Sequence, residues 1–229
     1  MRHLSIRLRL ISLVGLLFSL SAAAADSSVA EYPPVKISVY SIHPNSPTYL
    51  ASSQQGAEQI PFYSGSVSEW IEVIPPITFS TDLKSGPKSS WVPSIPGIDK
   101  WIIILSGDSG ENGKLHLMTL PATKSSIPNS TLVLGNLMHE QINGEYNGHG
   151  FILKSQTFEI EKLRSNRISI DARTVTTPYY CNIMIPNIEA ERRYLLLMAP
   201  PHVKGSAMMM YRLVKIPDSL YTTETHKTP

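Results

Sequence analysis

Cysteine is nearly absent from this 229-residue chain, since Cys181 is the only one. A single thiol cannot form an internal disulfide, and it cannot supply the paired thiolates of a Cys-x-x-Cys metal site. A hydrophobic core must therefore stabilise the fold. Cys181 is expected inside that core as a small apolar residue.

Charged residues are also scarce, at 17% of the chain, and the formal net charge is only +2. Three of the basic residues, Arg2, Arg7 and Arg9, precede an apolar run from Ile11 to Leu20 and the small residues 21–25. This is the layout of a secretory signal peptide, with cleavage expected after residue 25. Ten apolar residues are too few for a membrane anchor, which needs ~20.

Removal of residues 1–25 would leave 17 basic and 18 acidic residues, a net charge of −1. Such a chain has no basic excess for nucleic acid and no polybasic patch for a membrane surface. We therefore predict a secreted or periplasmic protein, with no nucleic-acid partner and no membrane span after cleavage. Residues 26–34 are expected to form a loose leader, 35–215 a folded domain and 216–229 a frayed tail.

Helix-forming patterns are few, whereas proline and β-branched residues are frequent. The most strand-like stretch is Lys100–Leu105, which is apolar without alternation and is therefore expected to be a central strand covered on both faces. By contrast, Arg167–Val175 alternates, with Ile168, Ile170 and Ala172 on one side and charged residues on the other. Asn147-Gly148 is typical of a hairpin turn.

These patterns predict an all-β fold, an Ig-like antiparallel β-sandwich of roughly twelve short strands. No internal repeat is visible. The stretches His43–Gln59 and Thr81–Gly97 are expected to be loops, and Gly135 suggests a bulge. Ile188–Leu197 has helix-forming composition, although a turn that enters a strand is the preferred interpretation. The strands come from fourteen candidate segments, some of them very short: Val35–Tyr40, Ile60–Tyr63, Val67–Ile74, Ile77–Thr81, Lys100–Leu105, Leu115–Leu120, Thr131–Leu137, Gln141–Tyr146, His149–Lys154, Gln156–Leu163, Arg167–Val175, Cys181–Ile185, Tyr194–Ala199 and Ala207–Val214.

Five short segments carry a resemblance: Trp101–Leu105, Leu115–Pro121, Ile127–Leu137, Tyr194–Pro200 and Met208–Arg212. In this order they resemble small secreted proteins of unknown function from Verrucomicrobia and related bacteria. The similarity covers about half of the chain that follows the signal peptide. It implies a secreted β-sandwich, and it brings no catalytic residues.

The chain has no complete hydrolase motif. Gly107–Gly110 reads Gly-Asp-Ser-Gly, like the nucleophile segment of trypsin-like proteases, but the required histidine segment is missing and turn residues are the better interpretation. Glu159 and Glu161 lie on one face of an expected strand, where exposure is favoured over the two sides of a glycosidase cleft. No catalytic residue is predicted.

Metal chemistry is also weakly indicated. His116, His139 and His149 lie on neighbouring expected strands and loops, and three histidines can hold zinc, but scattered polar histidines are the favoured interpretation. Met208–Met210 with His202 suggests Cu(I), yet successive strand residues point to opposite faces, so core filling is preferred. No metal and no cofactor are predicted.

Four aromatic residues in or beside expected loops remain as weak binding candidates: Trp70, Trp91, Tyr179 and Tyr180. Exposed aromatic rings can stack on a glycan or anchor a protein partner, although core packing is the alternative. The sequence therefore favours a non-catalytic binding or cell-envelope interaction module, with an envelope protein or a glycan as partner. An extracellular carbohydrate-active enzyme, or another hydrolase, is the alternative.

Overall fold

The structure is a computed structural model that describes residues 32–42, 48–52, 60–63, 65, 67–81, 88–107, 115–201, 203 and 205–216. The residues from Tyr32 onward belong to one compact unit. The expected signal peptide, most of the leader (26–34), the tail after Ile216, the turn after Gly107 and His202 lie outside the described residues.

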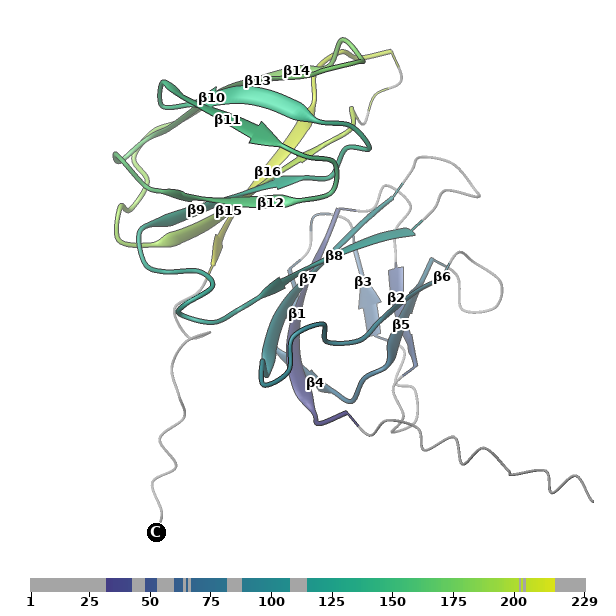
Figure 1. Cartoon of the computed structure of the whole chain (residues 1–229). Helices are drawn as coiled ribbons and strands as arrows, with labels where there is room; N and C mark the ends of the chain where they lie inside the picture. The colour runs from purple at the N-terminus through teal and green to yellow at the C-terminus, as the bar shows by residue number, and fades with distance from the viewer. Residues whose placement is uncertain are drawn as a thin grey trace, which may run out of the picture. The chain divides into compact units, whose positions relative to one another are not determined.

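The described residues form strands and no helix, so the all-β class is confirmed (Figure 1). Within them, no helix is long and apolar enough to cross a membrane. Sixteen strands replace the roughly twelve expected. They are β1 (Val35–Ser41), β2 (Thr48–Ser52), β3 (Ile60–Phe62), β4 (Ile71–Val73), β5 (Ile77–Ser80), β6 (Lys88–Trp91), β7 (Lys100–Gly107), β8 (Leu115–Pro121), β9 (Thr131–Asn136), β10 (Ile142–Tyr146), β11 (His149–Leu153), β12 (Phe158–Lys162), β13 (Ile168–Thr174), β14 (Tyr180–Ile185), β15 (Arg193–Ala199) and β16 (Met210–Ile216).

The strands form four sheets of four. Sheet A has the order β4-β1-β7-β8 and sheet B the order β3-β2-β5-β6. Sheet C has the order β12-β9-β15-β16 and sheet D the order β11-β10-β13-β14. We call β1–β8 the first sandwich and β9–β16 the second sandwich.

The second sandwich repeats the topology of the first. Adding eight to each strand number of sheets A and B gives sheets C and D. The strand directions repeat as well: β1 and β7 are parallel, β9 and β15 are parallel, and every other pair of neighbours is antiparallel. The chain is therefore a structural tandem repeat, which the sequence did not reveal, and its sheets are not purely antiparallel. The Ig-like type stays a prediction.

The repeat is visible in one pair of strands once the topology aligns them. Lys100–Leu105 of β7 and Arg193–Met198 of β15 both read basic, aromatic, then four apolar residues. In β7, Trp101 packs into the core between sheets A and B, and Ile102 into the core between sheets A and C. In β15, Tyr194 packs into the core between sheets C and D, and Leu195 packs into the core between sheets A and C.

Three hydrophobic cores separate the four sheets. One lies between sheets A and B, one between A and C, and one between C and D. Sheets A and C are therefore covered on both faces. Two-sided burial explains why Lys100–Leu105 lacks alternation, and its prediction as a central strand is confirmed because Trp101 to Leu105 are all buried.

Sheet D has one exposed face, and its strands alternate accordingly. Ile168, Ile170 and Ala172 of β13 are buried, whereas Asp171 and Arg173 are exposed, as predicted. The Asn147-Gly148 turn is also confirmed: it joins β10 to β11 with φ angles of 48° and 79°. Positive φ at both positions suits a type I′ turn.

Several local predictions were wrong. β2 lies inside the expected loop His43–Gln59, and β6 lies inside the expected loop Thr81–Gly97. Both strands belong to sheet B, where pairing with β5 supplies their backbone hydrogen bonds. The expected strand Val67–Ile74 is reduced to β4 and an isolated bridge at Val67.

Two further predictions concern β9 and β15. The helical alternative for Ile188–Leu197 is excluded, because β15 begins at Arg193. Gly135 is not a bulge, since β9 pairs without a register shift on both sides. A Cβ at Gly135 would lie 2.6 Å from Leu197 Cδ2 and 3.0 Å from the Phe158 ring, so the glycine makes room for its neighbours.

Candidate functional site

The two tryptophan candidates lie against hydrophobic cores. Trp91 is buried, and its ring contacts Trp101 edge-on at a centroid distance of 5.4 Å. Trp70 is half-buried against the core between sheets A and C. Trp91 therefore has no ring face left for a ligand, and Trp70 has little.

The two tyrosine candidates lie at one end of β14. Tyr179 is half-buried against the core of the second sandwich, whereas Tyr180 is 48% exposed. The backbone of Tyr180 is held on both sides: its N–H donates to Ala207 O at 2.9 Å, and its carbonyl accepts from Met209 N at 2.8 Å. Tyr180 therefore presents its ring from a fixed backbone at the edge of sheet D.

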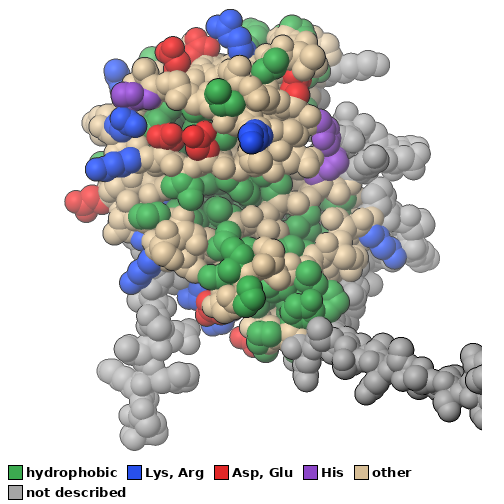
Figure 2. Space-filling model, viewed as in Figure 1, with side chains coloured by type: hydrophobic (Ala, Val, Ile, Leu, Met, Phe, Trp, Pro, Cys, Tyr) green, Lys and Arg blue, Asp and Glu red, His purple; other side chains and the backbone are tan. Residues whose placement is uncertain are grey.

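Polar side chains follow Tyr180 across the outer face of sheet D. The strand register places Asn143, Arg173 and Tyr180 in one row. It places Glu145, Asp171 and Asn182 in the next row. Residues paired in register project from the same face, so these six exposed side chains share one surface, which we call the sheet D face. In Figure 2, acidic and basic side chains gather over the second sandwich, at the top of the view.

Two adjoining depressions mark the sheet D face. The first has a volume of about 530 Å³ and is lined by Asn143, Glu145 and Val175, among others. The second, of about 380 Å³, extends to Tyr179 and Tyr180. Both share Asp171, Arg173 and Thr174, so they form one continuous surface with an exposed aromatic ring at one end.

A carboxylate fixes the loop beside these depressions. Glu140 accepts hydrogen bonds from the backbone N–H groups of Thr176 and Thr177, at 2.8 and 3.1 Å, and from the Thr177 hydroxyl. Burial alone would raise the pKa of Glu140, but these hydrogen bonds outweigh it and hold the pKa at about 2. The loop that leads to Tyr179 is therefore anchored by an ionised group at neutral pH.

The carboxylates Glu159 and Glu161 lie elsewhere, on edge strand β12. Their register partners, Leu134 and Leu132, point into the core between sheets C and D, so both carboxylates face that side. Burial, and then the charge of Glu161, raise the pKa of Glu159. One oxygen of Glu159 is buried without a hydrogen-bond partner. Neither depression on the sheet D face includes Glu159.

The remaining chemical candidates are mostly structural. Cys181 is buried, as predicted, and burial followed by the charge of Asp171 raises its pKa to about 11, so the thiol is not reactive. Met209 is in the core whereas Met208 is exposed, so these two cannot converge on a metal. In the described part of the chain, no three His, Cys, Asp or Glu side chains are grouped to hold a metal ion.

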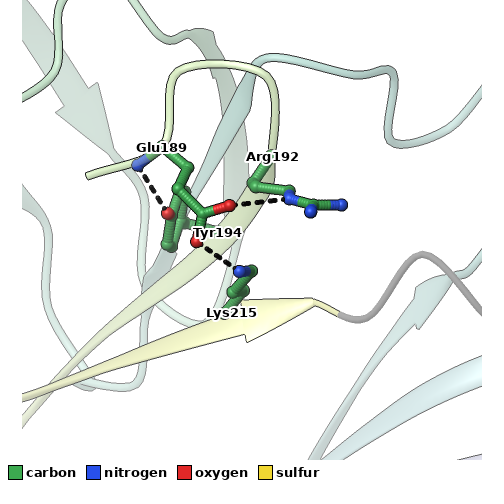
Figure 3. Close-up of polar contacts among 4 residues, drawn as sticks. All are labelled: Glu189, Arg192, Tyr194 and Lys215. Carbon is green, nitrogen blue, oxygen red and sulfur yellow. Dashed lines mark hydrogen bonds and ion pairs between the residues drawn. The ribbon is translucent and has the colours of Figure 1, made fainter.

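One charged cluster is a structural anchor. Glu189 binds the Lys215 ammonium, and its other oxygen lies 2.9 Å from Arg192 Nε, as Figure 3 shows. The Tyr194 hydroxyl accepts the Glu189 backbone N–H at 3.0 Å. These contacts lower the pKa of Glu189, the Lys215 bond most of all, and fix the turn before β15. Both cations of this cluster bind the same carboxylate, so the cluster serves the turn.

The chain matches no protein-family model and no curated protein sequence. The arguments for a site therefore rest on its geometry. Sequence analysis named Tyr179 and Tyr180 but missed Asn143, Glu145, Asp171 and Arg173. Two of them could have been found from the sequence, because the alternation of Arg167–Val175 already placed Asp171 and Arg173 on the outer side of the strand. Only the pairing of β13 with β10 and β14 brings them beside the tyrosines.

Proposed function

We propose that the protein is a secreted or periplasmic, non-catalytic binding module that holds a saccharide of the cell envelope on the sheet D face. The layout of residues 1–25 supports the compartment. The resemblance to small secreted β-sandwich proteins supports a module of the same kind. The single observation that supports a saccharide as the ligand is the continuous surface formed by Tyr180, Arg173 and Asp171.

The chemistry of this surface suits a sugar ring. An exposed tyrosine offers an apolar ring face, and carboxylate, guanidinium and amide groups beside it can bond to hydroxyl groups. The larger depression, at about 530 Å³, has the size of a small-molecule site. A stable protein partner would need about 800 Å² of surface with an apolar centre, whereas the centre of this face is polar.

Binding is favoured over catalysis because the acids on this face are exposed. Glu145 and Asp171 are cross-strand neighbours, and a glycosidase also uses two carboxylates close to one another. A glycosidase acid, however, needs burial to keep its proton at neutral pH. Glu145 and Asp171 lie on an open sheet face that offers no such burial.

The test is retention of the chain on immobilised polysaccharides, namely peptidoglycan, chitin and cellulose, combined with crosslinking in the envelope fraction. Tyr180→Ala and Arg173→Ala are each expected to weaken binding about tenfold, as loss of one central contact does. Tyr211→Ala is the matched control, because Tyr211 is 45% exposed on β16 of sheet C and lines neither depression. Equal binding by all three variants, or crosslinking to a protein alone, would refute a saccharide site here.

A second candidate, an extracellular hydrolase, rests on the raised pKa and the unpartnered oxygen of Glu159. A perturbed acid is a functional-site signal, although structural groups show it too. The double variant Glu159→Ala, Glu161→Ala tests whether this carboxylate pair is catalytic. If any hydrolytic activity of the chain survives this double change, the carboxylate pair is not its source.

A further inference from the structure

Two histidines from different sandwiches meet at one point. His116 lies on β8 of the first sandwich, and His139 follows β9 of the second. Their rings are 4.6 Å apart, centroid to centroid, at an angle of 68°. The side-chain amide of Gln156 lies between them: its Nε2 is 3.4 Å from His116 Nδ1 and 3.2 Å from His139 Nδ1.

This geometry aims two nitrogen lone pairs at the same place. An amide nitrogen only donates hydrogen bonds, so the Gln156 contacts assign both Nδ1 atoms as acceptors. Imidazole with an unprotonated nitrogen is the commonest side-chain ligand of zinc and related ions. We infer that His116, His139 and Gln156 form a binding site for a divalent transition-metal ion, with Zn²⁺ as the representative.

The three ligands would be two imidazole nitrogens and the amide oxygen of Gln156. Metal–nitrogen bonds of about 2.0–2.1 Å require the His139 ring and the Gln156 side chain to shift so that an ion can lie next to His116 Nδ1. His139 and Gln156 are exposed and can make that adjustment, while His116 is half-buried and fixes the position. Rotation of the amide by half a turn would bring its oxygen to the ion, and water would complete a tetrahedral shell.

The backbone around this point is fixed by a buried side chain. Asn136 Nδ2 donates to the carbonyls of Glu140, Leu153 and Lys154, at 2.8, 3.2 and 2.9 Å. Its Oδ1 accepts the N–H of Met138 at 2.8 Å. These contacts hold the residue before His139 and the residue after it, as well as the segment that leads to Gln156.

A second contact ties the two ligand loops to each other. The hydroxyl of Ser155 donates to the carbonyl of Met138 at 3.0 Å, so the residue before Gln156 is bonded to the residue before His139. Gln156 itself has a φ of 53°, in the left-handed region, which a non-glycine residue adopts only when its surroundings impose it. The backbone that carries His139 and Gln156 is therefore held in place, which lowers the entropic cost of binding an ion.

Sequence analysis treated these histidines as scattered, and His149 indeed lies apart from them, 3.2 Å from Arg164 Nη1. His149 is thus a matched control: it is an exposed histidine of the same sandwich with its own polar partner. The inferred site is independent of the saccharide site, because none of its ligands lines a depression of the sheet D face. An ion held here would link β8 to the second sandwich and so stabilise the packing of sheets A and C.

The experiment is titration of the chelator-treated chain with ZnCl₂ alone, followed by calorimetry, and thermal unfolding with and without Zn²⁺. One ion per chain is expected, together with a rise in unfolding temperature, because an ion that binds only the folded state stabilises it. His139→Ala should weaken binding tenfold or more and abolish the temperature rise, since even loss of an outer-shell partner costs 10- to 100-fold. Gln156→Ala should weaken binding to a smaller extent.

His149→Ala should bind Zn²⁺ as the unchanged chain does. His139 is exposed, so its replacement should leave the fold intact, which the unfolding curve without Zn²⁺ verifies. Three results would each overturn the inference: no binding at up to about 1 mM Zn²⁺, undiminished binding by His139→Ala, or an equal loss in His139→Ala and His149→Ala.

Discussion

Sheets C and D share one hydrophobic core and differ in what covers their other faces. All seven residues of β15 in sheet C are buried, because sheet A packs against the face of sheet C that points away from sheet D. β13 in sheet D alternates buried and exposed residues, because its outer face is open. The same strand geometry thus gives a continuous apolar run in one sheet and strict alternation in the other.

On the proposed function, this difference separates stability from recognition in the second sandwich. The central strands of sheet C are buried on both faces, between sheets A and D, and their side chains hold the two sandwiches together. Sheet D contributes one face to the core and leaves the other for polar groups, with Tyr180, Arg173 and Asp171 among them. Substitutions in the two sheets should therefore separate the two roles.

The largest effect is expected between sheets A and C. Leu197→Ala removes a side chain that is 1% exposed, and the expected loss of unfolding free energy is about 3–5 kcal/mol. Met184→Ala on the outer face of sheet D, where Met184 is 68% exposed, should change it by less than about 0.5 kcal/mol. Urea denaturation measures both, and similar losses would mean that the two faces are not different environments.

Next in size is the buried amide of Asn136. Asn136→Ala leaves three carbonyl groups and one N–H without this partner inside the fold, and we expect a loss of about 2–3 kcal/mol. Asn143→Ala on the sheet D face is the control, since Asn143 is exposed and its loss should change stability little. Denaturation curves that coincide for the two variants would contradict the anchoring role of Asn136.

A smaller effect is expected from the glycines under the sheet D face. A Cβ at Gly144 would lie 2.6 Å from the backbone oxygen of Asp171, which cannot move aside cheaply, so Gly144→Ala should cost about 1–2 kcal/mol. At Gly150 the nearest atom would be 3.9 Å away, so Gly150→Ala should be neutral or slightly stabilising. The two variants are compared by thermal unfolding, and the prediction fails if Gly150→Ala is the less stable.

The smallest effects are the pH dependences of two acids, which should have opposite signs. The pKa of Glu140 is lowered from 4.5 to about 2, so its stabilisation is complete above pH 4.5 and is lost as the pH falls toward 2. Glu140→Gln should therefore be less stable than the unchanged chain at pH 7 and nearly equal to it at pH 2.

Glu159 has a raised pKa, so the folded chain retains its proton above pH 4.5, and stability is lost as the pH rises through that raised pKa. Glu159→Gln cannot ionise and should unfold at a higher temperature than the unchanged chain at pH 7, with no gain at pH 4. Unfolding temperatures measured between pH 2 and 7 test both acids. Shifts of the same sign in the two variants at pH 7 would contradict their opposite environments.

Local sequence was informative wherever burial alone decides the pattern. The run Lys100–Leu105, the alternation of Arg167–Val175 and the Asn147-Gly148 turn were all predicted correctly, because each follows from covered faces or from allowed φ angles. β6 was missed because three of its four residues are polar, and β2 because the residues on either side of it are rich in Ser, Pro, Gln and Asn. Pairing with β5 is what makes both segments strands. The His116–His139 contact was missed because the two residues belong to different sandwiches.

The sequence by itself determined that this protein is all-β, that Cys181 is buried, and that certain strands must be covered on both sides. These are properties of single segments, set by side-chain volume, branching and hydrophobicity. Only the tertiary structure decided that eight strands repeat as eight more, that sheets A and C face each other, and which polar residues become neighbours. Those relations depend on strand pairing between distant segments, and the backbone hydrogen bonds that fix it are the same for every residue type except proline.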